Sequence, residues 1–377
     1  MIYPNYDRSI LSTTASILRH FGVNSLYPTL PEVDAALATG PKHVALVLAD
    51  GAGAGPLAKH LPQDAYLRRM QAATVTSVFP STTTAAITTY YAGKSPLEHG
   101  WLGWSLYFKE YATDAVTFLR KTFYTGREID GPSPAMSLMP YESVFEQIRR
   151  THPEVKTCTQ YAFPTYAEHG AEVNLRISTL HQLCENIRRI TREPRRTFSI
   201  SYWAEPDASM HQYGVASAQA GAQLRLLNQE LEALSRQLKD TLLIVTADHG
   251  LIDGQFAEIT EYPDITECLW MPPMVEMRAA AFYVKPYRYR QFESAFREHF
   301  GADFLLLSRD EVLEKGLLGR GLPHGKLDDF LGDYLACATG SLCLKYSLPG
   351  QQKSPIAAVH AGLTEDEMLV PVLLHRL

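Results

Sequence analysis

Three strand-like runs of this sequence are each followed within a few residues by a carboxylate. They span 43–49 (HVALVLA), 197–203 (TFSISYW) and 241–247 (TLLIVTA). Short apolar runs rich in β-branched residues indicate strands buried on both faces, as in a parallel sheet covered by helices. An amphipathic pattern over 216–239 predicts a helix between the second and third runs. We therefore expect a βαβ order and an α/β fold.

Length and patterning give the expected domain organisation. With 377 residues, the chain can form one large domain or a core that carries a smaller inserted cap. Mixed patterns rich in proline and tyrosine place insertions at about 105–196 and 255–340, the second with a strand over 280–284. A further helix is predicted over 9–21. We predict a single domain over 1–377 with these two insertions.

Composition and charge exclude several classes of protein. The formal net charge is −6 and basic residues are scattered, which disfavours nucleic acid as a structural partner. The five cysteines show no CxxC spacing, so neither a disulfide framework nor a thiolate metal site is expected. The first residues lack the features of a secretion signal, and no apolar run is long enough to span a bilayer. We expect a soluble, cytoplasmic protein without a membrane partner, and no pattern indicates its oligomeric state.

Asp50 directly follows the first predicted strand and precedes three closely spaced glycines. The carboxyl ends of strands are where α/β sheets bind ligands, and glycines allow a ligand to approach the backbone closely. The spacing does not match the GxGxxG dinucleotide fingerprint, and a carboxylate there would repel a pyrophosphate unless a cation intervened. An isolated Asp-Gly is more often a turn, so Asp50 becomes a candidate only through the other segments.

A run of hydroxyl residues occupies the start of a helix predicted over 83–92. Ser81 and Thr82 are suitable N-cap residues, and a glycine ends the pattern. Thr83 then lies in the first turn, where free backbone N–H groups and the helix dipole favour an anion such as a phosphoryl group. A hydroxyl there is a poor nucleophile unless a metal or base removes its proton. The local pattern alone does not choose among Ser81, Thr82, Thr83 and Thr84.

Two acid–histidine pairs follow the second and third strands. Asp207 and His211 are four residues apart, so one helical turn brings both side chains to the same face. Asp248 and His249 would face opposite ways on a strand, so they share a site only if the chain turns there, as Gly250 allows. A lone histidine in either place is more often structural. Two such pairs behind strands of one sheet indicate a metal site.

One further histidine completes the candidate set. His360 lies in VHAGLTEDEMLVP, after a loop that contains proline and glycine and before an acidic helix start. His324, in LPHGK, also lies beside glycine in a loop and is its competitor. Taken alone, neither histidine is a strong signal.

Together these segments resemble the alkaline phosphatase superfamily, most closely its type I phosphodiesterase and nucleotide pyrophosphatase branch. The resemblance rests on the strand ending in Asp50-Gly51 and on the motifs FPSTTTAAITTYYAG, LEHG, EPDASMHQYG, TADHG and VHAGLTEDEMLVP. These motifs cover the chain from near residue 43 to its end. The resemblance implies an alkaline-phosphatase-like three-layer α/β/α core with a mostly parallel sheet and a smaller inserted cap.

The resemblance also implies roles for individual residues. Thr83, which stands ten residues before Gly93, would be the catalytic nucleophile. Two metal ions would each receive imidazole and carboxylate ligands, which suit Zn²⁺ first and Mn²⁺ second, since Mg²⁺ and Ca²⁺ prefer oxygen. The ligands of the first ion would be Asp207, His211 and His360. Those of the second would be Asp50, Asp248, His249 and the oxygen of Thr83.

The expected activity is that of a metal-dependent phosphohydrolase. It would cleave phosphodiester or pyrophosphate bonds of a small phosphorylated substrate, such as a nucleotide, through a phospho-threonine intermediate. A phosphomonoesterase, a phosphonate hydrolase and a phosphomutase are alternatives on the same two-metal core. A non-catalytic metal-binding protein has no positive support in the sequence. A dinucleotide-dependent oxidoreductase would rest only on the glycines after Asp50.

One position departs from the nucleotide pyrophosphatase pattern. In that pattern an asparagine shortly after the His-Gly helps to hold the phosphoryl oxygen, whereas the aligned place here is near Trp104, in HGWLGW. Trp104 and Tyr107 are weak candidates for stacking on a base or another aromatic group of the substrate, because a tryptophan among leucines is more often core. The sequence therefore defines the metal chemistry better than the substrate class.

Overall fold

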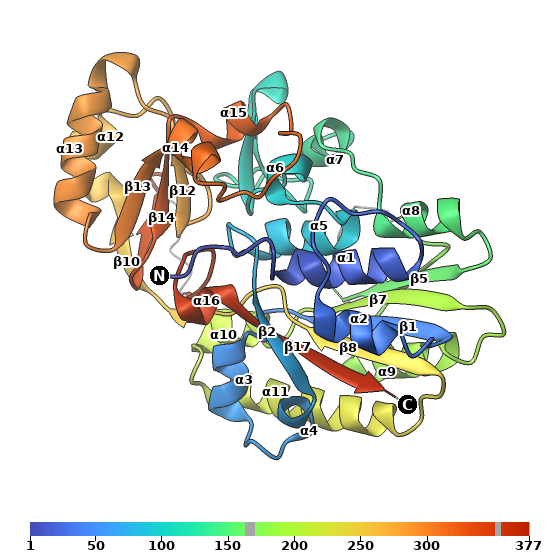
Figure 1. Cartoon of the computed structure of the whole chain (residues 1–377). Helices are drawn as coiled ribbons and strands as arrows, with labels where there is room; N and C mark the ends of the chain where they lie inside the picture. The colour runs from blue at the N-terminus through green and yellow to red at the C-terminus, as the bar shows by residue number, and fades with distance from the viewer. Residues whose placement is uncertain (163–169, 351–355, 377) are drawn as a thin grey trace.

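A seven-stranded sheet forms the centre of the computed structural model, which describes residues 1–162, 170–350 and 356–376 (Figure 1). Strand β1 pairs in parallel with β7 and β8, and β5 pairs in parallel with β7 and β6. Strand β17 runs antiparallel to both of its neighbours, β2 and β8. The strands lie in the order β2 (Gln71–Thr76), β17 (Leu369–Arg376), β8 (Thr241–Thr246), β1 (His43–Ala49), β7 (Thr197–Trp203), β5 (Lys156–Tyr161) and β6 (Val173–Arg176).

Helices cover both faces of this sheet and give three layers (Figure 1). One face carries α1 (Ile10–His20), α2 (Pro31–Leu37), α5 (Thr83–Ala92) and α8 (Val144–Thr151). The other carries α3 (Ala54–His60), α4 (Tyr66–Arg69), α9 (Leu180–Ile190), α10 (Asp207–Tyr213) and α11 (Ala218–Ser235). Every residue of β1 and β8 is buried, because helices lie on both sides of the sheet. The predicted α/β/α core with a mostly parallel sheet is confirmed.

The main predicted elements have nearly the predicted bounds. Strands β1 and β7 and helix α5 begin and end where expected, and β8 ends one residue earlier. The helix predicted over 216–239 is α11, Ala218–Ser235, and it begins later because Ser217 caps it by accepting a hydrogen bond from the backbone N–H of Ala220. The strand predicted over 280–284 is β12, shifted toward the N-terminus by one to two residues.

A second, smaller sheet lies beyond one end of the main sheet, and all of its strands are antiparallel (Figure 1). Its strands lie in the order β13 (Phe304–Ser308), β14 (Tyr334–Ala338), β12 (Ala279–Phe282), β11 (Met274–Val275), β3 (Ser105–Phe108) and β4 (Thr113–Val116). The helices around it are α12 (Pro263–Thr266), α13 (Tyr289–Phe300), α14 (Arg309–Glu314) and α15 (Leu327–Leu331). We call this sheet with its helices the cap.

Short elements complete the described chain. Two strand pairs are β9 (Ile252–Asp253) with β16 (Ala358–Val359), and β10 (Gln255–Glu258) with β15 (Leu342–Lys345). The remaining helices are α6 (Pro96–His99), α7 (Pro134–Leu138), α16 (Glu365–Met368) and the 3-10 turns Lys109–Tyr111, Ile259–Glu261 and Pro286–Arg288. Within the three described ranges, no helix has both the length and the apolar character needed to cross a lipid bilayer.

The stretches predicted as insertions supply different parts of the fold. The stretch 105–196 begins with cap strands β3 and β4, whereas its later part forms β5, β6 and helices α8 and α9 of the main core. The stretch 255–340 supplies β10 and the cap strands β11 to β14. The division of the chain into one domain, 1–377, with two insertions stays a prediction.

A buried ion pair joins the cap to the C-terminal segment. Arg278, just before β12, and Glu367, in α16, are both fully buried. The guanidinium donates from Nε and Nη2 to the two carboxylate oxygens, at 2.7 Å each. It also donates to the carbonyl oxygens of Gly340 and Leu342, at 2.8 Å each. Because both charges are paired in bidentate geometry and further hydrogen-bonded, the pair fixes how these segments meet.

Removing one partner of this pair should destabilise the protein strongly. We expect Arg278→Met to lower the free energy of unfolding by about 3–5 kcal/mol, because it leaves the Glu367 carboxylate buried and unpaired. Urea unfolding followed by circular dichroism would measure the change. Arg297→Met, which removes an exposed arginine of α13, is the matched control and should stay within about 0.5 kcal/mol of the wild type. Equal stability of the Arg278 variant and the wild type would contradict the expectation.

Candidate metal centre

The carboxyl ends of three neighbouring strands bring three carboxylates together. Asp50 directly follows β1, Asp207 begins α10 after β7, and Asp248 follows β8. The loops are tied to each other, because the Asp207 N–H donates to the Asp50 carbonyl at 3.1 Å and the Gly51 N–H donates to Asp248 Oδ1 at 3.0 Å. Gly51 has φ +70°, and a Cβ there would lie 2.6 Å from a methyl carbon of Leu251. This turn therefore requires glycine.

Each of these carboxylates is buried and has one oxygen without a hydrogen-bond partner. The exposed fractions are 3% for Asp50, 9% for Asp207 and 0% for Asp248. Within the described chain, Asp50 Oδ1, Asp207 Oδ1 and Asp248 Oδ2 accept no hydrogen bond. A buried carboxylate oxygen left unpaired is costly, and a bound cation is the usual remedy. The donor set therefore fits metal ions.

Three histidines present the same ring nitrogen to these carboxylates. In His211, His249 and His360, Nδ1 lies within hydrogen-bonding distance of a backbone carbonyl. A carbonyl only accepts, so Nδ1 carries the proton and Nε2 keeps a free lone pair. The carbonyls belong to Ala358, Gly250 and Ser81, at 2.7, 3.1 and 3.2 Å respectively. The backbone thus orients all three rings with Nε2 available to a metal ion.

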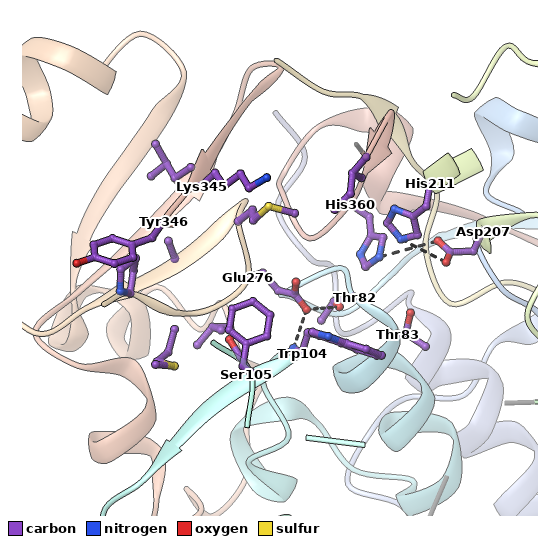
Figure 2. A pocket seen from close by; sticks show the side chains of 18 of the residues that line it. Thr82, Thr83, Trp104, Ser105, Asp207, His211, Glu276, Lys345, Tyr346 and His360 are labelled. Atoms are coloured by element: carbon purple, nitrogen blue, oxygen red, sulfur yellow. Dashed lines mark hydrogen bonds and ion pairs between the residues drawn. The ribbon is translucent and has the colours of Figure 1, made fainter. Parts of the chain in front are cut away.

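The Nε2 atoms lie close to the carboxylate oxygens, and Figure 2 shows the imidazoles of His211 and His360 beside the Asp207 carboxylate. His211 Nε2 is 3.3 Å from Asp207 Oδ2, and His360 Nε2 is 3.9 Å from Asp207 Oδ1. His249 Nε2 is 3.3 Å from Asp248 Oδ2 and 3.6 Å from Asp50 Oδ1. The structure thus brings all six predicted carboxylate and imidazole ligands into one connected centre.

The grouping of the ligands differs in one respect from the predicted division. Two sets have ligand atoms that all lie within 4.8 Å of one another: Asp50 with Asp248 and His249, and Asp207 with His249 and His360. The first set matches the predicted second site. In the other set His249 takes the position that was expected for His211. The His249 ring stacks on the His360 ring with centroids 3.9 Å apart, which brings it close to this set. His211 contacts this set through Asp207.

Burial, together with neighbouring charges, shifts the pKa values of the centre. Burial, and then repulsion from Asp207 and Asp248, raises the pKa of Asp50 well above its usual range. Burial also raises the pKa of Asp207, against the opposing effect of His211 and His249. Burial, and then the neighbouring imidazoles, lowers the pKa of His360 well below its usual range. Positive charge supplied at the centre would relieve the repulsion among the carboxylates.

Among the four hydroxyl candidates, Thr83 alone combines partial exposure with contact to the centre. Its Oγ1 lies 3.2 Å from His249 Nε2, and its side chain lines the cavity described below. The Ser81 hydroxyl donates to the Gly362 carbonyl, and the Thr82 hydroxyl donates to Glu276. Thr84 is fully buried. The tertiary structure therefore separates candidates that local sequence did not.

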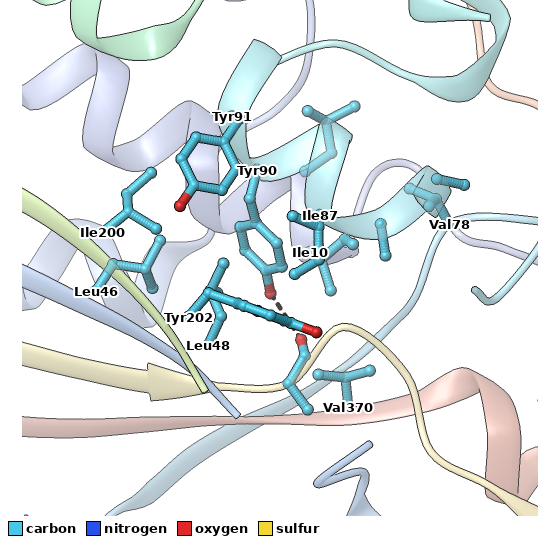
Figure 3. Packing of buried hydrophobic residues seen from close by; sticks show 14 of the residues in the cluster. Ile10, Leu46, Leu48, Val78, Ile87, Tyr90, Tyr91, Ile200, Tyr202 and Val370 are labelled. Atoms are coloured by element: carbon cyan, nitrogen blue, oxygen red, sulfur yellow. Dashed lines mark hydrogen bonds between the residues drawn. The ribbon is translucent and has the colours of Figure 1, made fainter. Parts of the chain in front are cut away.

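Helix α5 holds Thr83 at its first position through a buried packing face. Ile87, Tyr90 and Tyr91 of α5 pack toward β1 and β7, where Leu46 and Ile200 meet them (Figure 3). The Tyr90 hydroxyl donates to the carbonyl of Ala247 at 3.0 Å, at the end of β8. No side chain caps the start of α5, so its first backbone N–H groups remain open to an anion.

A cavity of about 580 Å³ opens from the centre toward the cap. Trp104 lines it, whereas Tyr107 is absent from its described lining and packs against the hydrophobic core. His324 lies outside the ligand sets, where its imidazole packs against Gly100. Of these sequence candidates, only Trp104 faces the cavity.

Two further residues of the site escaped the sequence analysis. Tyr202, inside β7, donates its hydroxyl to Asp50 Oδ2. Glu276, between β11 and β12, lines the cavity and accepts hydrogen bonds from the Thr82 hydroxyl and the Trp104 N–H. Tyr202 lies in an apolar strand pattern, where a tyrosine is expected as a buried core residue, so the pattern gave no sign of a role in the site. Glu276 has no motif around it, so only the tertiary structure reveals its position.

Comparison with known proteins places the chain in a family. A sequence model described as type I phosphodiesterase / nucleotide pyrophosphatase matches residues 44–300, which is more than half of the chain. The protein belongs to this family. As a member of this family, the protein is a phosphoesterase-type hydrolase. No curated protein sequence matches this family member.

Solved structures share the fold of this family member at 16% sequence identity. Murine ectonucleotide pyrophosphatase / phosphodiesterase 5 has a TM-score of 0.67 over 89% of this chain and 88% of its own. An inactive form of that protein in complex with AMP has a TM-score of 0.66 over 88% and 87%. Phosphonoacetate hydrolase from Sinorhizobium meliloti 1021, in complex with phosphonoformate, has a TM-score of 0.63 over 89% and 90%.

Neutralising one carboxylate should have opposite effects with and without metal. Burial raises the pKa of Asp50 in the folded state above its value in the unfolded state. Ionisation of Asp50 therefore lowers the free energy of unfolding once the pH exceeds the unfolded-state pKa, and this loss of stability is present at pH 7. Asp50→Asn should therefore stabilise the metal-free protein at pH 7 by about 1–3 kcal/mol. The same change should abolish most of the stabilisation by Zn²⁺, which for the wild type is about 2.7 kcal/mol at a hundredfold excess over Kd.

Thermal unfolding with EDTA and with added Zn²⁺ would measure both effects. The exposed Asp64 provides the matched control, because Asp64→Asn should change neither measurement. A metal-free Asp50→Asn protein that is less stable than the wild type, with an unchanged response to Zn²⁺, would contradict the assignment.

Proposed function

We propose that the protein is a two-metal phosphodiesterase or nucleotide pyrophosphatase that acts through a phospho-threonine intermediate on Thr83. Zn²⁺ is the preferred ion and Mn²⁺ the alternative, because the ligands combine imidazole nitrogen with carboxylate oxygen. The substrate is a small phosphorylated molecule. The similar solved structures hold AMP, a phosphate monoester, and phosphonoformate, a phosphonate.

One observation carries the proposal. Three buried carboxylates, each with an unpartnered oxygen, converge with the Nε2 atoms of three imidazoles, and the Thr83 hydroxyl lies within hydrogen-bonding distance, at 3.2 Å, of one of these nitrogens. A structural role would pair these groups with protein donors instead. Cations bound in this arrangement would lower the pKa of the Thr83 hydroxyl, the candidate nucleophile. They would also stabilise negative charge on the phosphoryl oxygens.

The residues have distinct parts in the proposed reaction. Bound divalent ions would lower the pKa of the hydroxyl, hold the phosphoryl oxygens and stabilise the leaving oxygen. Thr83 Oγ1 attacks phosphorus, and the bond from phosphorus to the leaving oxygen breaks as the new bond forms. The uncapped start of α5 presents backbone N–H groups to the phosphoryl oxygens. Water then cleaves the phospho-threonine and restores the hydroxyl.

Removal of the Thr83 hydroxyl should abolish turnover without dismantling the centre. We expect Thr83→Ala to lower kcat by about 10³-fold or more, because it removes the hydroxyl proposed to form the covalent intermediate. Thr83→Ser, which keeps a hydroxyl, should retain most of the activity. Rapid quenching followed by mass spectrometry should find phosphate on the peptide that contains Thr83. Full turnover by the alanine variant, with its Zn²⁺ binding intact, would refute the proposed nucleophile.

The bond class can be ranked with chromogenic substrates. We expect kcat/KM for bis(4-nitrophenyl) phosphate to exceed that for 4-nitrophenyl phosphate by about tenfold or more. The cavity beyond Thr83 has room for a second substituent, and a monoester brings additional negative charge toward Glu276. Phosphonoacetate should be a poorer substrate than the diester. A preference for the monoester would favour a phosphomonoesterase instead, and a preference for phosphonoacetate would favour a phosphonate hydrolase.

A further inference from the structure

Glu276 presents a carboxylate to the cavity beside the candidate nucleophile (Figure 2). Its Oε1 accepts two hydrogen bonds, from the Thr82 hydroxyl at 2.6 Å and from the Trp104 N–H at 2.7 Å. Thr82 directly precedes Thr83, so the carboxylate is anchored one residue from the reacting hydroxyl. No group of the described chain donates to Oε2. One oxygen therefore fixes the side chain, while the other remains available to a ligand.

The backbone around Glu276 is built to hold it in this place. Val275 has φ +77°, a left-handed conformation that is strongly disfavoured for a β-branched residue. The next N–H, of Glu276, donates to the carbonyl of Ala279 at 3.1 Å and closes the turn. Strain of this kind is commonly retained where a side chain must be placed for function.

Gly103 allows this strained turn to approach the nucleophile segment. A Cβ at Gly103 would lie 2.6 Å from Val275 Cγ1 and 2.7 Å from the Val275 carbonyl oxygen. The second glycine of HGWLGW is thus required by the turn that carries Glu276. The neighbouring Trp104, near the aligned place of the asparagine in the nucleotide pyrophosphatase pattern, supplies its backbone N–H to the carboxylate.

The surroundings of Glu276 define what its free oxygen can bind. Lys345 is the only other charged side chain in the described cavity lining outside the candidate metal ligands, and Figure 2 shows it on the far side of the cavity from Thr83. Trp104, Phe123 and Tyr124 add aromatic walls. Burial raises the pKa of Glu276 to about 7, so above pH 7 its carboxylate is ionised, attracts hydrogen-bond donors and cations, and repels anions.

Resting on the proposed function, we propose that Glu276 is a specificity-determining residue that selects the alcohol substituent of the substrate. Its Oε2 accepts a hydrogen bond from a hydroxyl or ammonium group on that substituent. The same carboxylate disfavours substrates that carry a further phosphate or carboxylate at this position. The favoured substrates are therefore phosphodiesters of polyols, sugars or amino alcohols, and pyrophosphate compounds are poorer.

The isosteric change Glu276→Gln tests this proposal by reversing the sense of the hydrogen bond. The amide oxygen of glutamine can keep the bonds from Thr82 and Trp104. Its NH₂ group then occupies the position of Oε2 and donates rather than accepts. The variant should lose the preference for donor-bearing substituents and gain tolerance of anionic ones.

Four phosphodiesters with the same 4-nitrophenyl leaving group would provide the measurement. Their second substituent is methyl, 2,3-dihydroxypropyl, 2-aminoethyl or carboxymethyl, and kcat/KM is measured with added Zn²⁺. For the wild type, at least one donor-bearing ester should exceed the methyl ester by about tenfold, and the carboxymethyl ester should fall about tenfold below it. Preference for dihydroxypropyl indicates a polyol or sugar, and preference for aminoethyl indicates an amino alcohol.

In Glu276→Gln, both ratios should move to within about threefold of unity. A merely structural role would change kcat/KM for all four esters by the same factor and leave the ratios unchanged. Glu298→Gln, an exposed glutamate-to-glutamine change on cap helix α13, should reproduce the wild-type ratios. The wild-type series stands as a test by itself if the Glu276 variant does not fold.

The outcomes separate the two proposals. If the wild type hydrolyses all four esters without discrimination, or if Glu276→Gln keeps the wild-type ratios, the role of Glu276 is refuted and the phosphodiesterase function stands. If the wild type with Zn²⁺ hydrolyses none of the four esters, the proposed function fails, and the role of Glu276 fails with it.

Discussion

Electrostatic repulsion among three buried carboxylates is the constraint on which the rest of the structure depends. Asp50, Asp207 and Asp248 are placed within one small region by adjacent strand ends, and each retains an oxygen without a protein donor. Such an arrangement is unfavourable unless cations occupy it, so the surrounding fold must hold it in place. The fully buried strands β1 and β8 supply that rigidity, because their packing on both faces fixes where the loops leave the sheet.

A second set of contacts joins the loops of the centre at one residue. The Glu367 carbonyl accepts from the N–H of Gly250, directly after His249, and its carboxylate accepts from the N–H of Gly362 at 2.7 Å. The Gly362 carbonyl in turn accepts from Ser81, in the nucleophile segment. Because Glu367 is also paired with Arg278, the cap residues near Glu276 are tied to the same point. The candidate metal ligands and the cavity wall are therefore positioned together.

Sequence predicted the parts of this protein whose causes are local. Apolar runs gave β1 and β7, and hydroxyl and glycine signals gave α5, with the observed bounds. The motifs also supplied the six side chains that the structure brings together. Glu276 was missed, because a strained turn and partners more than 150 residues away determine its position. The stretch 105–196 divides between both sheets, since strand pairing across long separations leaves no trace in local pattern.

The position of His249 in both ligand sets constrains how metal ions would bind at the centre. Its Nε2 belongs to both tight ligand sets, yet a single lone pair can coordinate only one ion. If two ions bind as proposed, the ion that takes this nitrogen would leave the other to complete its shell with another ligand, and the His211 imidazole, 3.3 Å from Asp207, is available for that role. The two ions would then bind in sequence with unequal affinities, because the first would set the ligands that remain for the second.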